Sequence, residues 1–246
     1  MSAVPLIIPD WPLPANLRAV QTTRAGGVST GPWQSLNLAL HTGDDPGAVQ
    51  RNRNLLAAAL EMPRLPMWPT QVHGTAVVDA AAMTGALKAD AVVARAPGEV
   101  CSVQTADCLP VLFATLDGRE VAAAHAGWRG LAGGVLEATL DALGYPPTAV
   151  TAWLGPAIGP EAFEVGPEVR AAFVGRDPEA AGAFTPGRGD RWFADIYHLA
   201  RLRLERAGLR EIHGGGRCTY AESETFFSYR RDGTCGRMAA LIWRVA

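Results

Sequence analysis

Four short β-rich runs between residues 91 and 125 constrain the fold more than any other feature of this sequence. They are Ala91–Ala94, Val100–Gln104, Val111–Leu116 and Val121–His125. Asp117-Gly118 lies between the last two runs, and an Asp-Gly pair in that position is typical of a tight hairpin. A hairpin joins antiparallel strands, so we do not expect a purely parallel, doubly wound sheet. The pattern favours an α+β fold with mixed sheets.

Helical signals lie on both sides of these runs. Asp45-Pro46 combines an N-cap residue with proline at the first helical position, and it predicts a helix that continues to about Leu60. The other predicted elements are a helix at Gly130–Ala142, a strand at Val150–Leu154, a helix at Pro167–Phe173, a helix between Asp195 and Gly208, and a hairpin of Phe226–Arg230 with Met238–Val245. The chain has no low-complexity linker, repeat or break in composition, so we expect a single domain over residues 1–246.

The composition excludes several classes of protein. The 22 Lys and Arg residues nearly balance 24 Asp and Glu residues, whereas a nucleic-acid-binding protein carries a basic excess. No apolar run approaches the roughly 18 residues of a membrane span, and no basic region precedes a long apolar stretch at the N-terminus. We therefore expect no nucleic acid, no membrane and a cytoplasmic location, where the four cysteines stay reduced.

Residue counts and local context exclude three kinds of site. Lys88 is the only lysine, and it lacks the preceding glycine and the following Ser or Thr of a P-loop. Five histidines are too few for a self-contained multicopper site. Gly27–Gly31 matches G-x-S-x-G, but no apolar strand precedes it and no helix follows, so we do not expect Ser29 to be a nucleophile.

Three segments end apolar runs with reactive side chains, and together they form a candidate metal site. They contain His73, Cys108 and His125. The spacing of these residues matches no zinc-finger rule, so two ordinary hydrogen-bonded histidines and a core thiol are an alternative interpretation. Two imidazoles and one thiolate are, however, a ligand set of catalytic zinc with its fourth position open. Such a zinc lowers the pKa of bound water toward ~7 or polarises a substrate oxygen.

The remaining histidines and several arginines are weaker candidates. His198 is expected to be exposed in the first turn of a helix, while His41 and His213 could each flank the site or only support a turn. An anionic ligand would need arginine, which binds phosphate in a bidentate manner; Arg129, Arg230 and Arg231 are candidates, as well as ordinary surface residues. We also place Arg24 within reach of the metal and predict that it holds phosphate, because the glycines that follow it allow a close approach of the backbone.

Several motifs in the same order along about residues 22–243 resemble the YfiH-like family. They are Thr23–Ser29 with Ser35–Leu38, Gln71–Gly74, Thr105–Pro110, His125–Gly130, Leu154–Gly159 and Phe226–Arg231. Members of this family are called polyphenol oxidase or laccase-domain proteins, purine nucleoside phosphorylases, and in some bacteria peptidoglycan editing factors. The resemblance implies a single αββα layered sandwich, similar to the cytotoxic-necrotizing-factor catalytic fold, with Zn²⁺ held by His73, Cys108 and His125.

The resemblance also implies an activity. The expected substrates are phosphate and a purine nucleoside (adenosine, inosine, guanosine or methylthioadenosine), with deamination of adenosine as a second reaction. We predict that Asp107 moves a proton in that deamination. Gln71, Arg24, Arg129 and Arg230 are the predicted substrate-binding residues; the sequence assigns no oligomeric state.

Two alternatives remain at this stage. One is a metal-free hydrolase in which His125 draws the proton from Cys108, acting as a peptidoglycan editing factor on cell-wall precursors. The other is a partner-binding protein in cell-wall maturation whose site has no activity.

Overall fold

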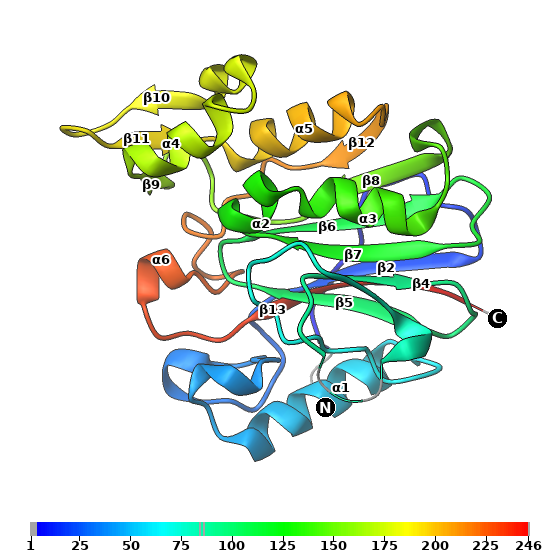
Figure 1. The fold of residues 1–246 in the computed structure, drawn as a ribbon. Coiled ribbons are helices and arrows are strands. Elements are labelled where there is room, and N and C mark those ends of the chain that lie inside the picture. The colour runs from blue at the N-terminus through cyan, green and yellow to red at the C-terminus, as the bar shows by residue number, and fades with distance from the viewer. Residues whose placement is uncertain (1–3, 84, 86, 246) are drawn as a thin grey trace.

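The computed structural model describes residues 4–83, 85 and 87–245, with two stacked β-sheets at its centre (Figure 1). The four-stranded sheet has the order β1 (Leu6–Ile7), β2 (Leu17–Thr22), β13 (Met238–Arg244) and β5 (Val100–Thr105). The six-stranded sheet has the order β12 (Glu211–Gly214), β8 (Val150–Leu154), β6 (Leu109–Thr115), β7 (Val121–Ala126), β4 (Ala91–Ala94) and β3 (Val77–Asp79). In the second sheet the pairs β3–β4 and β12–β8 are parallel and the others antiparallel, which confirms the prediction of mixed sheets.

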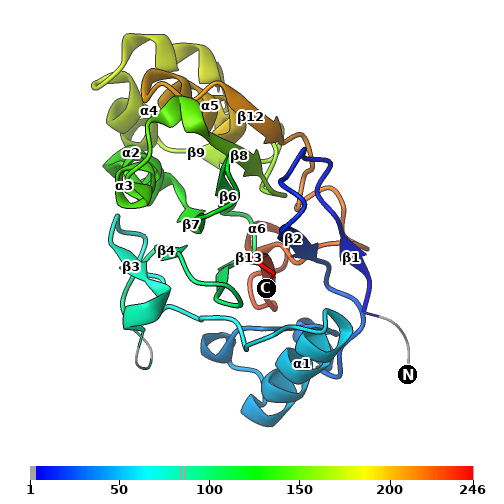
Figure 2. The same cartoon turned by 90° about the vertical axis from the view of Figure 1, so that its right-hand side faces the viewer.

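Helices cover the outer face of each sheet (Figure 2). Helix α1 (Pro46–Ala59) lies against the four-stranded sheet, and helices α2 (Trp128–Gly133), α3 (Val135–Leu143), α4 (Pro167–Val174) and α5 (Ile196–Arg206) lie on the side of the six-stranded sheet. A small sheet of β10 (Phe184–Pro186), β11 (Trp192–Ala194) and β9 (Glu164–Val165) extends beyond these helices. Short 3₁₀ helices occupy residues 31–33, 40–42, 80–82, 147–149 and 178–183. The order helix, sheet, sheet, helix confirms the predicted α+β layered fold.

The alternation of side chains along β13 explains the stacking. Ala240 and Ile242 pack between the two sheets, while Leu241 and Trp243 face α1 on the other side. Successive residues of a strand point to opposite faces, so this apolar strand is buried on both faces. In the part of the chain that the structure describes, no helix is both long and apolar enough to cross a membrane.

One predicted helix is interrupted. The segment expected to form a single helix over Gly130–Ala142 is instead divided into α2 and α3 by Gly134, whose φ of 109° is in the left-handed region. Apolar residues recur with helical spacing on both sides of Gly134, so the sequence pattern alone did not indicate a break. Glycine is the residue that takes this conformation without a steric cost.

The predicted hairpin around Asp232-Gly233 is wrong. Residues 226–228 form no strand, helix α6 (Tyr229–Asp232) follows them, and β13 pairs with β2 and β5 instead. The physical reason lies in the side chains: Phe226 and Phe227 are fully buried, and the Ser228 hydroxyl caps α6 by accepting a hydrogen bond from the backbone N–H of Arg231. An Asp-Gly pair marks a hairpin only when β-strands flank it on both sides.

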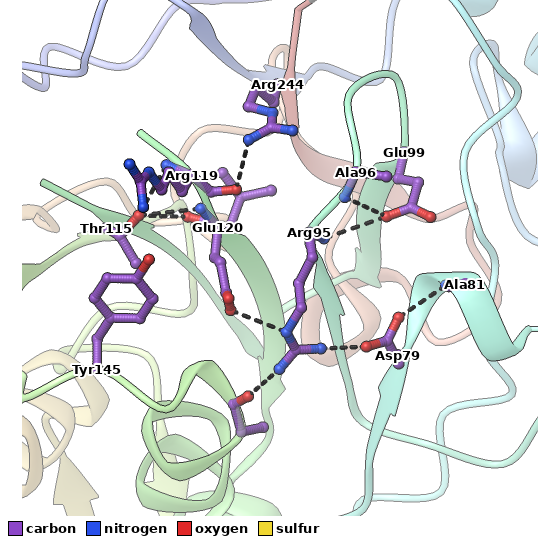
Figure 3. A network of polar contacts seen from close by, with 12 residues as sticks. Asp79, Ala81, Arg95, Ala96, Glu99, Thr115, Arg119, Glu120, Tyr145 and Arg244 are labelled. Carbon is purple, nitrogen blue, oxygen red and sulfur yellow. Dashed lines mark hydrogen bonds and ion pairs between the residues drawn. The ribbon is translucent and has the colours of Figure 1, made fainter. Parts of the chain in front are cut away.

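Arg95, just after β4, joins the six-stranded sheet to the helix α3 that covers it, in the network drawn in Figure 3. Its guanidinium pairs with Asp79 and, at 3.2 Å, with Glu120, and it donates to the carbonyl of Ala142 in the last turn of α3. A cation at this position satisfies a carbonyl that the helix itself leaves without a partner. This network joins the β3–β4 edge to the start of β7 and to α3.

Candidate metal centre

Strand pairing brings Cys108 and His125 together. His125 is the fifth residue of β7 and is buried, and Cys108 comes directly before β6. The two strands are antiparallel, with Pro110 opposite His125. Cys108 lies two residues before Pro110, so its side chain reaches the same face of the sheet as that of His125.

His73 joins this pair from the loop that precedes β3. One potential ligand atom from each of His73, Cys108 and His125 lies within 4.8 Å of the others. The imidazoles of His73 and His125 meet edge to face with ring centroids 4.8 Å apart, and Cys108 Sγ is 4.0 Å from His73 Nε2. In the described ranges this is the one group of three or more His, Cys, Asp or Glu side chains arranged to share a metal ion.

The chemistry of the three donors fits a metal ion. Nitrogen and sulfur ligands of a tetrahedral zinc lie about 3.5 Å apart, given bonds of about 2.0 and 2.3 Å. The separation of 4.0 Å between Cys108 Sγ and His73 Nε2 requires only a small contraction to reach that value. On a tetrahedral ion, three protein ligands would leave a fourth position for water or substrate, as catalytic zinc sites do.

Asp90, which was not predicted from the sequence, contacts the imidazole of His125 and the backbone of His73. Its carboxylate is fully buried and accepts a hydrogen bond from His125 Nδ1 at 2.8 Å. It also accepts from the backbone N–H groups of Val72, His73 and Gly74 at 3.2, 2.9 and 2.7 Å. The available signal in the sequence was a single acidic residue directly before the apolar run Ala91–Ala94.

The site is electrostatically coupled. Burial alone would raise the pKa of the Cys108 thiol, but the charge of His125 and hydrogen bonds from His125 and His73 lower it to about 6. Burial alone would lower the pKa of His125, but the Cys108 thiolate and the hydrogen bond to Asp90 raise it to about 9. Despite the burial of its carboxyl, the pKa of Asp90 is lowered by its hydrogen bonds with His125 and the backbone of Gly74. Without metal, these shifts favour a thiolate beside an imidazolium.

The three candidate ligands line a cavity of about 390 Å³, and one of them, His125, lies three residues before the start of α2. The residues around it also include two of the candidates from the sequence, His41 and Gln71. The side-chain amide of Gln71 donates to the backbone carbonyl of Gln104 at 2.8 Å and accepts from its backbone N–H at 2.7 Å. These two hydrogen bonds also fix the position of Gln104 in the cavity wall. The other lining residues, which were not candidates from the sequence, are Gln104, Thr105, Ala106, Tyr229 and Arg237.

Four predicted site residues do not line this cavity. Asp107 is buried beside Cys108, but its carboxylate accepts from Thr219 Oγ1 and from the backbone N–H of Arg230, at 2.7 and 2.6 Å. The exposed guanidinium of Arg230 donates to the carbonyl of Glu164, and that of Arg129 stacks on Trp128. Arg24 lines a separate cavity and donates to the carbonyls of Gln34 and Ser223.

The other histidine predictions had mixed outcomes. His198 lies in the first turn of α5 as expected, yet its side chain is half-buried rather than exposed. His213 belongs to β12 and lies 3.6 Å from the carboxylate of Glu211.

The Ser29 hydroxyl donates to the buried carboxylate of Asp44 at 2.6 Å, which gives this serine a structural role.

A family model described as multi-copper polyphenol oxidoreductase laccase matches residues 18–245. The chain belongs to this YfiH-like family. The Escherichia coli K12 protein named purine nucleoside phosphorylase YfiH is 55% identical, over 98% of this chain and 99% of the relative. A Pseudomonas aeruginosa protein, also named purine nucleoside phosphorylase, is 54% identical over 96% of this chain and 97% of the relative.

Solved structures of the family share the fold. A Neisseria meningitidis protein has a TM-score of 0.95 and 51% identity, with 98% of this chain and 99% of that chain covered. YlmD from Geobacillus stearothermophilus has a TM-score of 0.92 and 32% identity, with 100% and 98% covered. The family description refers to several coppers, whereas the His73, Cys108 and His125 group offers a place for a single ion within the described residues.

Proposed function

We propose that this protein is a zinc-dependent purine nucleoside phosphorylase with adenosine deaminase activity. The observation that carries the proposal is a His-Cys-His group open to a cavity large enough for a nucleoside. The proposal is supported by two relatives, 55% and 54% identical to this chain, that are named purine nucleoside phosphorylase. The proposal takes residues 1–246 as one catalytic domain that acts in the cytoplasm.

His73, Cys108 and His125 would hold the zinc. Two neutral imidazoles and a thiolate suit this ion, which supplies Lewis acidity toward water or a substrate oxygen when bound. Cys108 offers a thiolate because the pKa of its thiol is low. The half-exposed side chain of Cys108 and the exposed side chain of His73 leave one side of the group accessible to substrate.

Arg237 is the proposed phosphate-binding residue. It is the arginine that lines the cavity, and its Nη1 donates to the carbonyls of Cys235 and Gly236 at 2.9 and 3.0 Å. These bonds fix the guanidinium plane, and a guanidinium held in this way would pair with an anion in two-point geometry.

Deamination requires a group that moves a proton at the purine amino position. Each carboxylate oxygen of Asp107 accepts a hydrogen bond, one from Thr219 and one from the backbone of Arg230, and Asp107 does not line the cavity. We therefore propose His41 for this role in place of Asp107. Burial and the neighbouring charges of Arg237, Arg53 and His125 lower the pKa of His41, so its imidazole is neutral and able to accept a proton near pH 7.

One assay tests the proposed function. Purified protein of known metal content is incubated with adenosine, with and without phosphate, and adenine, inosine and hypoxanthine are separated. Adenine that forms only with phosphate supports phosphorolysis, and inosine formed in both conditions supports deamination. The proposal is wrong if neither product forms with protein that contains about one zinc per chain.

A second candidate function follows from the contact between Asp90 and His125. Asp90, His125 and Cys108 have the composition of a carboxylate-oriented Cys-His pair, and the low pKa of Cys108 suits a nucleophile. A metal-free hydrolase, such as a peptidoglycan editing factor, would use this arrangement. The two functions differ in their metal requirement: a hydrolase keeps its activity on muropeptide precursors when chelators remove zinc, and a zinc enzyme loses it.

A further inference from the structure

Asp90 links the imidazole of His125 to the loop that carries His73, and it is not among the residues that line the cavity. Oδ1 accepts from His125 Nδ1 at 2.8 Å and from the backbone N–H of His73 at 2.9 Å. Oδ2 accepts from the N–H groups of Val72 and Gly74. Its main chain takes part as well, because the carbonyl of Asp90 accepts from the N–H of His125 at 2.7 Å.

The contact with His125 determines which ring nitrogen carries the proton. An ionised carboxylate only accepts hydrogen bonds, so Nδ1 of His125 must be the protonated nitrogen. Nε2 is then the nitrogen that binds a metal, and it gives up its own proton on binding when the ring is an imidazolium. Metal-binding histidines commonly need such a partner on the other nitrogen, which fixes the tautomer and the orientation of the ring.

The contact with residues 72–74 determines where His73 points. Three successive N–H groups converge on one carboxylate, an arrangement that backbone adopts around an anion. His73 has a φ of 60°, which is unfavourable for a residue with a side chain. Such a conformation persists when its surroundings impose it, and here the surrounding group is the Asp90 carboxylate.

We propose that Asp90 is a positioning residue that prepares both His73 and His125 to bind metal before any metal arrives. The inference rests on the proposed metal-dependent function, but it concerns metal affinity rather than the reaction. It assigns Asp90 two simultaneous effects: it fixes the tautomer of His125 and it holds the turn that carries His73.

Asp90→Asn tests the proposal with little change in side-chain size. If the amide nitrogen takes the place of Oδ1, it faces the N–H of His125 Nδ1, and two donors then point at each other. If it takes the place of Oδ2, it faces the backbone N–H groups of Val72 and Gly74, with the same conflict. Either arrangement disturbs one imidazole. We expect zinc affinity, measured by competition with a chromophoric chelator, to fall about 10- to 100-fold. We also expect the slowly exchanging Nδ1 proton of His125, seen by NMR in the zinc-loaded wild-type protein, to shift or disappear.

Glu99→Gln is the matched control. Glu99 is also buried, and its carboxylate accepts from the N–H groups of Arg95 and Ala96, but it contacts no imidazole. Wild-type zinc affinity in Glu99→Gln supports the proposal, and an equal loss in both variants overturns it, since the effect would then be general loosening. Unchanged affinity in Asp90→Asn also overturns it.

A measurement on the wild-type protein covers the case in which Asp90→Asn does not fold. Hydrogen exchange at the amides of Val72, His73 and Gly74 is compared with and without zinc. Protection in the metal-free protein supports the proposal, whereas protection that develops only with zinc overturns it. If the nucleoside assay yields no product, the proposed function is wrong, but the metal-binding results for Asp90 keep their meaning.

Discussion

Gly127 lies so close to His73 that a β-carbon on it would stand 2.9 Å from His73 Cδ2, and 3.1 Å from Cys108 Sγ. Its φ of −62° and ψ of 156° are open to any residue, so the requirement for glycine is space and not backbone freedom. The residue directly before α2 therefore forms part of the wall against which two of the three candidate ligands pack.

Gly127→Ala should displace His73, Cys108 or both. We expect zinc affinity to fall about tenfold or more, as it does when the groups that orient metal ligands are disturbed, while the secondary structure by circular dichroism stays the same. Gly182→Ala is the control, because a β-carbon there would meet only His198 Cε1 at an ordinary 3.7 Å. If Gly127→Ala binds zinc as tightly as the wild-type protein, the neighbouring side chains make room for the added methyl group and the prediction is wrong.

Cys108→Ala and His125→Ala should both abolish turnover, but with different effects on stability. The half-exposed Cys108 contacts His73 and His125 only through its sulfur, which is a weak hydrogen-bonding atom, so its loss should change the free energy of unfolding by about 1 kcal/mol. Removal of the buried His125 leaves the Asp90 carboxylate without one of its donors, which costs about 1–3 kcal/mol. Denaturant unfolding of the metal-free proteins measures the difference. Equal stabilities would mean that water replaces the imidazole at Asp90.

Much of the fold was predictable because its signals are local. Asp45 accepts hydrogen bonds from the N–H groups of Gly47 and Ala48 as a helix cap, and the Asp117-Gly118 turn joins antiparallel strands, both as the sequence indicates. The error at residues 226–230 arose because Phe226 and Phe227 have a strand-like composition, yet they are buried in a loop that packs against the core. Burial of this kind depends on tertiary contacts, which a local pattern does not contain.

The candidate site shows the same division. His73, Cys108 and His125 were identifiable from their residue types at the ends of apolar runs, and the structure brings them together. Asp90 was not, because its contact with His125 depends on the pairing of β4 with β7 across 35 residues of sequence. Arg237 was missed for a similar reason: only the tertiary structure places it on the cavity wall.

Metal removal should expose a reactive thiol at Cys108. The pKa of this thiol is lowered from its ordinary value of 9.0 to about 6, and alkylation follows the thiolate fraction. In protein stripped by a chelator, the rate of reaction with iodoacetamide should rise with pH to half its maximum near pH 6 and level off above about pH 7. Zinc should suppress this reaction. Cys108→Ala supplies the background from Cys218, and a midpoint between pH 8 and 9 would contradict the predicted coupling to His125.

The last prediction separates two arginines. The sequence favoured Arg24 as the phosphate-binding residue, but its guanidinium donates to the carbonyls of Gln34 and Ser223 at 3.2 and 2.9 Å and stacks on Phe227. These contacts join two distant loops, so Arg24→Gln should lower the free energy of unfolding by about 1–3 kcal/mol and leave the KM for phosphate unchanged. Arg237→Gln should instead raise the KM for phosphate roughly tenfold or more, since it removes a charge-assisted contact to the anion. Deamination uses water and no phosphate, so its kcat/KM should stay near the wild-type value in Arg237→Gln. A raised phosphate KM in Arg24→Gln alone would mean that the sequence-based choice is correct and that Arg237 only shapes the cavity.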